Sequence, residues 1–209
     1  MPVDWSTDAL LADYRRRVAE NYLSAPLTGE AGWVEFRRRR DDLFGTHPRS
    51  ALDDEQRRLT PSLPYYPYDP TARVEARYEP FTDDAGEVTL DTGGDDGVLR
   101  LRRLARLWTP FGALTLFWLA VYGGGLFLPF RDATSGRQTY GAGRYLTDTA
   151  KGTFGRGFAV NGTRAVLDFN YAYNPSCAYN SLAACPLAPR DNHLDAPVRA
   201  GELAYPLPH

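Results

Sequence analysis

The sequence has almost no lysine. Lys151 is the single lysine among 24 Lys and Arg residues, which nearly balance 26 Asp and Glu residues for a net charge of −2. A charge so close to neutral does not predict a nucleic-acid-binding protein, because such proteins carry an excess of cations. Arginine suits bidentate contact with a carboxylate or phosphate, but a GC-rich coding sequence explains its excess more simply.

Cysteine and histidine are also scarce, with 2 Cys and 3 His. Seven residues separate Cys177 from Cys185, so the pair lacks the close spacing of zinc knuckles and we expect no metal site. A Cys–His pair with His193, a disulfide and buried free thiols are the alternatives. Free thiols are favoured because we expect a reducing compartment.

Long apolar runs are absent except for one, residues 109–130, which holds no charged side chain. The run is long enough to cross a membrane, but Gly123–Gly125 interrupt it and Pro110 and Pro129 bracket it. Strand-forming residues on both sides of the glycines predict a hairpin buried on both faces, with a span or a buried helix as alternatives. The N-terminus has no apolar core before its charges, so we expect no signal peptide, no membrane partner and a cytoplasmic protein.

The N-terminal part has helical periodicity. Apolar residues recur every four positions from Leu10 to Tyr22, which predicts a helix capped by Ser6 or Thr7. A second helix is predicted over residues 31–44 and ended by Gly45.

Two local patterns carry specific expectations. Arg37–Arg40 are followed at once by Asp41 and Asp42, so this arginine tetrad is interpreted as a solvated helix face. The proline-rich segment 61–70 predicts extended chain that is too aromatic for a loose linker. Its tyrosines are expected to dock on the body of the protein, namely Tyr65, Tyr66 and Tyr68.

The rest of the chain is predicted to be β-rich. Strands are expected at 73–81, 87–92, 98–108, in the hairpin, at 138–146 and at 165–169, with 148–162 a loop and Asn161-Gly162 a turn. Short strands without intervening helices indicate an antiparallel arrangement. We therefore predict an α+β chain, with N-terminal helices (residues 1–60) packed on a mainly antiparallel β-barrel or sandwich (residues 61–209).

Polar side chains concentrate in three stretches beside the most apolar strands: RDATSGRQTYGAGRYL (131–146), LDFNYAYNPSCAYN (167–180) and CPLAPRDNHLDAPVRAGE (185–202). Polar groups at the ends of buried strands need hydrogen-bond partners in the chain or in a ligand. Arg131, Arg144 and Asn170 could therefore line a pocket for an anionic or polar small molecule. Alternatively, Asp132 and Asp168 pair with arginines and lock the turns.

These stretches, with YYPYDPTARVEARYEPF upstream, resemble a bacterial and archaeal domain-of-unknown-function family, number 1684 (DUF1684), over about Trp33 to Glu202. The resemblance implies no activity and no cofactor. The chain departs from the family pattern in its triple glycine and in Asp191, where glutamate is typical. The residues that carry over are Arg131, Asp132, Thr134, Gly136, Tyr140, Gly143, Arg144, Tyr145, Asp168, Asn170, Tyr173, Asn174, Cys177, Cys185 and Asn192.

This set, apart from its glycines and Tyr145, forms the candidate ligand site. The expected function is small-molecule binding or catalysis, and a non-catalytic structural or interaction module is the alternative. A flavin phosphate held by Arg131, Thr134 and Arg144 fits the pattern, but nothing in the sequence requires it. The Asp132–Asp168 pair is too common a pattern to favour acid–base chemistry. Reaction, cofactor and oligomeric state are not indicated.

Overall fold

The computed structural model describes residues 5–23, 28–81, 85–91, 97–181, 183 and 185–206. Within them, three helices precede all the strands. The helices are α1 (Trp5–Leu23), α2 (Gly29–Thr46) and α3 (Asp54–Leu59). The strands are β1 (Arg73–Pro80), β2 (Glu87–Asp91), β3 (Val98–Thr109), β4 (Gly112–Leu119), β5 (Leu126–Phe130), β6 (Arg144–Asp148), β7 (Phe158–Asn161) and β8 (Arg164–Asp168).

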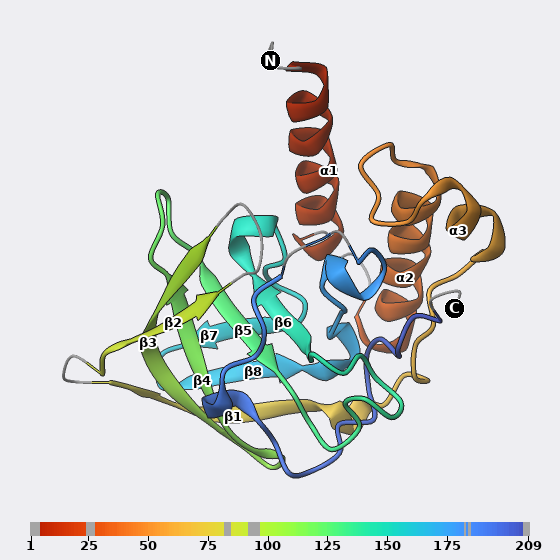
Figure 1. The fold of residues 1–209 in the computed structure, drawn as a ribbon. Coiled ribbons are helices and arrows are strands. Elements are labelled where there is room, and N and C mark those ends of the chain that lie inside the picture. The colour runs from red at the N-terminus through yellow and green to blue at the C-terminus, as the bar shows by residue number, and fades with distance from the viewer. Residues whose placement is uncertain are drawn as a thin grey trace.

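All the strands belong to one antiparallel sheet, which curls into a half-barrel (Figure 1). Its order is β6-β5-β4-β3-β1-β8-β7, and β2 pairs with the first half of β3. The predicted α+β class is therefore confirmed. The segment GGDDG (residues 93–97) joins the strands expected at 87–92 and 98–108, which predicts a turn, and it lies outside the described residues except for Gly97.

The apolar run forms the β4–β5 hairpin that the sequence predicts. Phe117 pairs with Phe127, and Trp118 pairs with Leu126. Gly124 has a φ of +61°, and a Cβ there would lie inside the indole of Trp118, so only glycine fits this turn. Both faces of β4 and β5 are buried, which explains why their sequences do not alternate.

Two hydrophobic cores lie on the two faces of the sheet. The helix-side core joins α1 and α2 to the sheet and includes Tyr22, Trp33, Phe36, Phe117, Phe127, Tyr145 and Tyr173. The second core draws on seven of the strands and includes Leu107, Leu114, Leu128, Phe130, Leu146, Leu167 and Phe169. The helix-side core takes residues from both sides of position 60, and the division into two domains stays a prediction.

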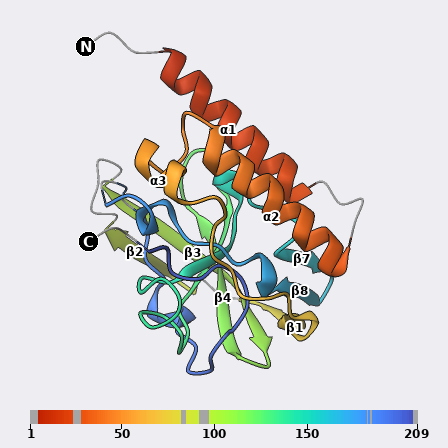
Figure 2. The same ribbon diagram turned by 90° about the vertical axis from the view of Figure 1, so that its right-hand side faces the viewer.

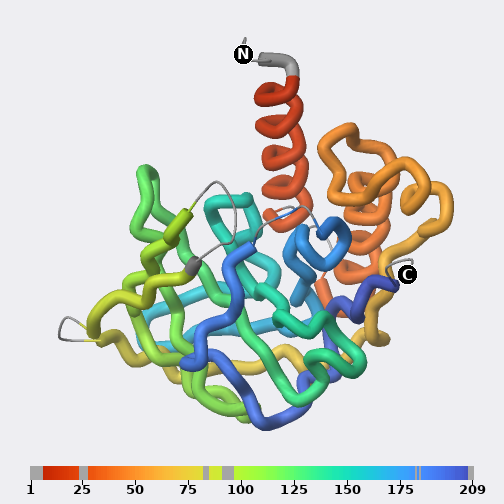
Figure 3. Tube along the Cα trace, viewed as in Figure 1, coloured from red at the N-terminus to blue at the C-terminus, as the bar shows by residue number. Residues whose placement is uncertain are grey.

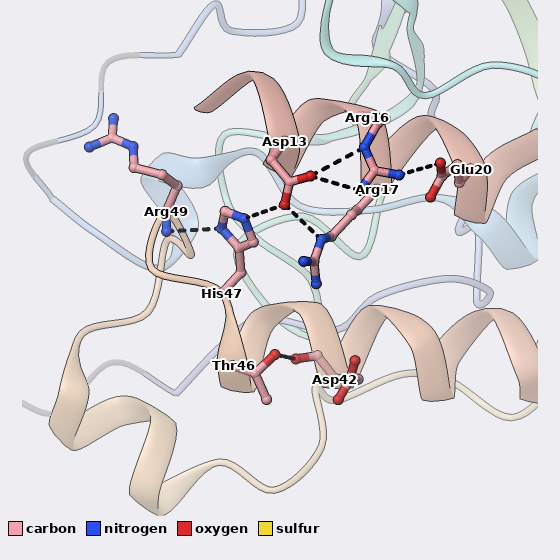
Figure 4. Close-up of polar contacts among 8 residues, drawn as sticks. All are labelled: Asp13, Arg16, Arg17, Glu20, Asp42, Thr46, His47 and Arg49. Carbon is pink, nitrogen blue, oxygen red and sulfur yellow. Dashed lines mark hydrogen bonds and ion pairs between the residues drawn. The ribbon is translucent and has the colours of Figure 1, made fainter. Parts of the chain in front are cut away.

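Helices α1 and α2 lie side by side against one side of the sheet (Figure 2). The buried amide of Asn21 donates to the carbonyl of Phe36 over 3.1 Å. At the other end of the pair, His47 Nε2 lies 3.3 Å from the Asp13 carboxylate (Figure 4). The two helices are thus tied by polar contacts as well as by packing.

Both helix ends differ from the prediction. Helix α1 begins at Trp5, so Ser6 and Thr7 lie within its first turn. Helix α2 continues through Gly45 to Thr46, because the chain becomes extended only at His47, before Pro48. The short helix α3 was not predicted, although Asp53 and Gln56 form a capping box at its start.

The interpretation of the arginine tetrad, Arg37–Arg40, as a solvated helix face is wrong in part. Arg38 and Arg39 do pair with Glu35 at the surface. Arg37 instead stacks on the rings of Trp33 and Tyr65, and Arg40 is only 5% exposed. Four consecutive helix positions cover all sides of a helix, so one of the four must face the sheet.

Two of the predicted β boundaries are also wrong. Residues 138–143 coil rather than extend, because the Thr134 carbonyl accepts from the backbone N–H groups of residues 137–139. The predicted loop at 148–162 contains β7, whose first residue, Phe158, is its only buried position. The Asn161-Gly162 turn is confirmed, since β7 pairs with β8 across it.

The proline-rich segment docks as expected. Tyr65 is buried and pairs through its backbone with Glu202. The ring of Tyr68 lies 5.8 Å from that of Trp33, and the Tyr66 hydroxyl donates to Gln138. Figure 3 shows the C-terminal segment crossing the sheet, and the Tyr205 hydroxyl lies 2.7 Å from that of Thr60, the residue that follows α3.

No helix within the described ranges combines the length and apolar character that a bilayer crossing requires. The cytoplasmic location stays a prediction.

Candidate functional site

The Arg144 guanidinium forms a buried ion pair with Asp132 over 2.7 Å. Asp132 follows β5, and its other oxygen accepts from the backbone N–H and hydroxyl of Thr134. The remaining Arg144 donors reach carbonyls of the C-terminal segment, including those of Val198 and Ala200. Burial lowers the pKa of this guanidinium, and the Asp132 carboxylate opposes that shift. The pair therefore fastens the C-terminal segment to the sheet.

A second buried pair joins the helices to the same segment. Arg40 of α2 donates to the Glu202 carboxylate over 3.0 Å, and Glu202 is fully buried. The same carboxylate accepts from the Tyr179 hydroxyl and from the backbone N–H of Asn174. The sequence does not predict this pair, because no local pattern shows which arginine of the tetrad turns inward.

In two asparagines of the candidate set, both the oxygen and the nitrogen of the side-chain amide form hydrogen bonds. Asn170 exchanges hydrogen bonds with the backbone of Asp69 and donates to Asp168 over 2.9 Å. Asn192 bridges β4, accepting from the Thr115 N–H and donating to its carbonyl. Burial raises the pKa of Asp168, while its bonds to Asn170 oppose that shift. These contacts favour a structural role for both amides.

The candidate residues thus fall into separate groups. Arg131, Asp132, Thr134, Arg144 and Asn192 lie around the end of β5, and Asp168 and Asn170 lie at the end of β8. The group with Tyr140, Tyr173, Asn174, Cys177 and Cys185 lies toward the helices. Whether the full set binds a ligand stays a prediction.

The two cysteines approach each other as free thiols. The backbone N–H of Cys177 lies 3.3 Å from the Cys185 sulfur, and the Tyr140 hydroxyl lies 3.6 Å from the Cys177 sulfur. His193 bonds instead to the carbonyl of Ala188. Among the described residues, no cluster of three or more His, Cys, Asp or Glu side chains is arranged to hold a metal.

A cleft of about 220 Å³ lies between α1, the loop after α2 and the short 3₁₀ helices at 149–151 and 176–178. We call it the basic cleft, because Arg15, Arg49 and Lys151 line it. Its described lining residues include no carboxylate. Figure 4 shows the Arg49 guanidinium directed away from the Asp13–His47 contact. These cations are far apart in the sequence, so no local motif predicts the cleft.

A smaller cavity of about 60 Å³ adjoins the basic cleft and shares Tyr14, Lys151 and Ser176 with it. Arg40 and Asn174 also line this inner cavity. The Nε of Arg40 and the Oδ1 of Asn174 are buried without a hydrogen-bond partner in the described chain. A donor and an acceptor are therefore unsatisfied beside a cavity, which is costly in a folded protein.

One buried carboxyl group lies near the cations of the cleft. Asp148 is 3% exposed, and one of its oxygens has no partner among the described residues. Burial raises the pKa of Asp148, and the positive charges of Lys151 and Arg15 oppose that shift. Asp148 thus interacts electrostatically with two of the three cations, Lys151 and Arg15.

Comparison with known proteins supports the resemblance. The family model described as "Protein of unknown function (DUF1684)" matches residues 61–203. The solution NMR structure of an uncharacterized protein from Haloarcula marismortui is similar, with 33% identity and a TM-score of 0.57, covering 83% of this chain and 93% of that one. No curated protein matches. The chain belongs to the DUF1684 family of proteins of unknown function.

Proposed function

We propose that this chain is a small-molecule-binding domain and that its ligand is a small anion held in the basic cleft. The observation that carries the proposal is the convergence of Arg15, Arg49 and Lys151 on one cleft whose described lining has no carboxylate. Arg15 comes from α1, Arg49 from the loop after α2 and Lys151 from the 3₁₀ helix at 149–151, so the fold and not a local charge run gathers them. Cations in a concave site attract anions and hydrogen-bond to them.

The inner cavity supports a ligand with both donor and acceptor atoms. Arg40 Nε can donate and Asn174 Oδ1 can accept, and neither has a partner in the described chain. Both volumes are small beside the roughly 300–1,000 Å³ of sites for drug-sized ligands. We therefore propose a phosphate or a small carboxylic acid, and the size disfavours a flavin. We assign no reaction.

The proposed site differs in part from the one that the sequence suggested. Tyr173 and Asn174 line the inner cavity, and Cys177 follows Ser176, which lines both spaces. The Arg144 guanidinium instead donates its hydrogen bonds to Asp132 and to backbone carbonyls of the C-terminal segment. Of the two arginines in the candidate set, Arg131 has the more exposed side chain.

The alternative function is a structural or interaction module. The buried Arg144–Asp132 and Arg40–Glu202 pairs favour it, because they account for much of the polar pattern without a ligand. It leaves the convergence of cations in the basic cleft unexplained. Binding measurements distinguish the two functions.

The test is a thermal-shift titration of the whole protein with inorganic phosphate, citrate and a sugar phosphate, with the neutral sugar as a control. We expect the anions to raise Tm, because a ligand that binds only the folded state stabilises it. Lys151→Gln and Arg49→Gln should each weaken that rise. Arg38→Gln is the matched control, because it removes one exposed cation from outside the cleft.

Two results would contradict the proposal. One is that none of the anions raises Tm, which would favour the structural module. The other is that Arg38→Gln weakens the effect as much as Lys151→Gln, which would indicate general charge screening rather than a site.

A further inference from the structure

Cys177 and Cys185 are held together by local backbone geometry. Cys177 lies in the 3₁₀ helix Ser176–Ala178, which presents its backbone N–H to the Cys185 sulfur over 3.3 Å. The two cysteines are free thiols rather than a disulfide. This contact places the Cys185 sulfur beside the backbone of Cys177, and a disulfide between the two residues requires such proximity.

The surroundings of the two sulfurs differ, and the difference assigns them different roles. Hydrogen bonds from the Cys177 thiol and its backbone N–H, together with the charge of Lys151 and the backbone N–H of Ser176, lower the pKa of Cys185 to about 6, against the opposing effect of burial. The hydrogen bond to Cys185 and burial raise the pKa of Cys177. Cys185 is thus the more acidic of the two thiols, and the thiolate is the nucleophilic form.

Access limits which oxidants can reach the pair. Cys185 is 6% exposed, whereas Cys177 is partly exposed and is adjacent to the exposed Ser176. A large protein oxidant would not reach the Cys185 sulfur without local opening. A small hydroperoxide is the chemical class that fits.

We propose that Cys177 and Cys185 form a redox-active dithiol, which a hydroperoxide oxidises to an intramolecular disulfide. In the first step the Cys185 thiolate attacks a peroxide oxygen, the O–O bond breaks, and the departing hydroxide or alkoxide takes up a proton. Cys185 is then a sulfenic acid. In the second step the Cys177 sulfur attacks the Cys185 sulfur, and the hydroxide released takes the Cys177 proton and leaves as water.

The electrons balance across the two steps. The two thiols lose two hydrogens and are oxidised by two electrons, while hydrogen peroxide is reduced to two waters. A thiol reductant reverses the change by exchange. This activity does not depend on an anion in the basic cleft, and its test reads the sulfurs directly.

The test uses the reduced whole protein treated with hydrogen peroxide, followed by intact-mass measurement after thiol alkylation. We expect a monomer lighter by two hydrogens, with neither cysteine alkylated, and recovery of both thiols with dithiothreitol. Cys177→Ser should stop at the sulfenic acid, which a cyclic dione traps on Cys185. Cys185→Ser should react roughly tenfold more slowly, because it lacks the more acidic of the two thiols.

Circular dichroism of both serine variants establishes that they fold, and alkylation of the unoxidised wild type gives a second measure. Cys185 should react with iodoacetamide faster than Cys177 at pH 7. Three results would overturn the proposal: a disulfide only between two chains, direct overoxidation of wild type to sulfinic acid, or equal peroxide reactivity of the two serine variants.

Discussion

Arg144 and Asp132 pair over 2.7 Å with side chains that are 1% and 0% exposed. The pair joins the start of β6 to the turn after β5, and the same guanidinium reaches backbone carbonyls of the C-terminal segment. The turn after β5, the start of β6 and the distant C-terminal segment thus meet at one side chain.

Replacing Arg144 with methionine keeps most of its volume and leaves the Asp132 carboxylate buried without its cation. We expect the free energy of unfolding to fall by about 3–5 kcal/mol, the usual cost of breaking a buried pair from one side. Urea denaturation measures it. Arg164→Met is the control, because its pair with Glu75 is exposed and should contribute within about 1 kcal/mol. Equal losses in the two variants would refute the structural role of Arg144.

Two glycine-to-alanine changes should act in opposite directions. Gly201 has a φ of +79°, and a Cβ there would lie 2.7 Å from the carbonyl oxygens of Phe169 and Ala172. Gly201→Ala should therefore lower Tm. Gly45 lies in helix α2 with nothing within 4 Å of its Cβ position, so Gly45→Ala should stabilise the protein by about 0.5–1 kcal/mol. A stabilising Gly201→Ala would contradict the close packing of the C-terminal segment.

Asp148 should make stability depend on pH. Burial raises its pKa above the ordinary 3.8, so the folded protein holds this proton more tightly than the unfolded chain does. The contribution of Asp148 to the stability of the folded protein is favourable below pH 3.8. It is lost as pH rises through the pKa that Asp148 has in the folded protein. The difference in unfolding free energy between Asp148→Asn and wild type should therefore shift in favour of the variant from pH 4 to pH 7. A constant difference across that range would contradict the raised pKa.

Local sequence patterns determined most of the secondary structure. Glycines between strand-forming residues predicted the β4–β5 hairpin, since a turn of positive φ and a run of extended, apolar residues are local properties. The helical periodicity from Leu10 to Tyr22 predicted α1. The boundary errors occur where a turn is closed by backbone bonds, as at Thr134, or where a strand has little to bury, as in β7.

The residues next to Arg40 in the sequence did not predict that its side chain is buried. Arg38 and Arg40 have similar local sequences, yet one pairs at the surface and the other bonds to Glu202 across 162 positions. The basic cleft has the same origin, because its cations meet only after α1 packs near residues 149–151.

The sequence by itself determined the α+β class, the buried hairpin, the docked tyrosines and the family. Each of these conclusions depends on secondary-structure propensity, hydrophobic periodicity or the order of motifs. All three are properties of short stretches of chain. Only the tertiary structure decided which polar groups form hydrogen bonds and ion pairs within the protein and which converge on a cavity. That outcome depends on contacts between distant residues, because a buried charge is stabilised by whatever partner the packing brings to it.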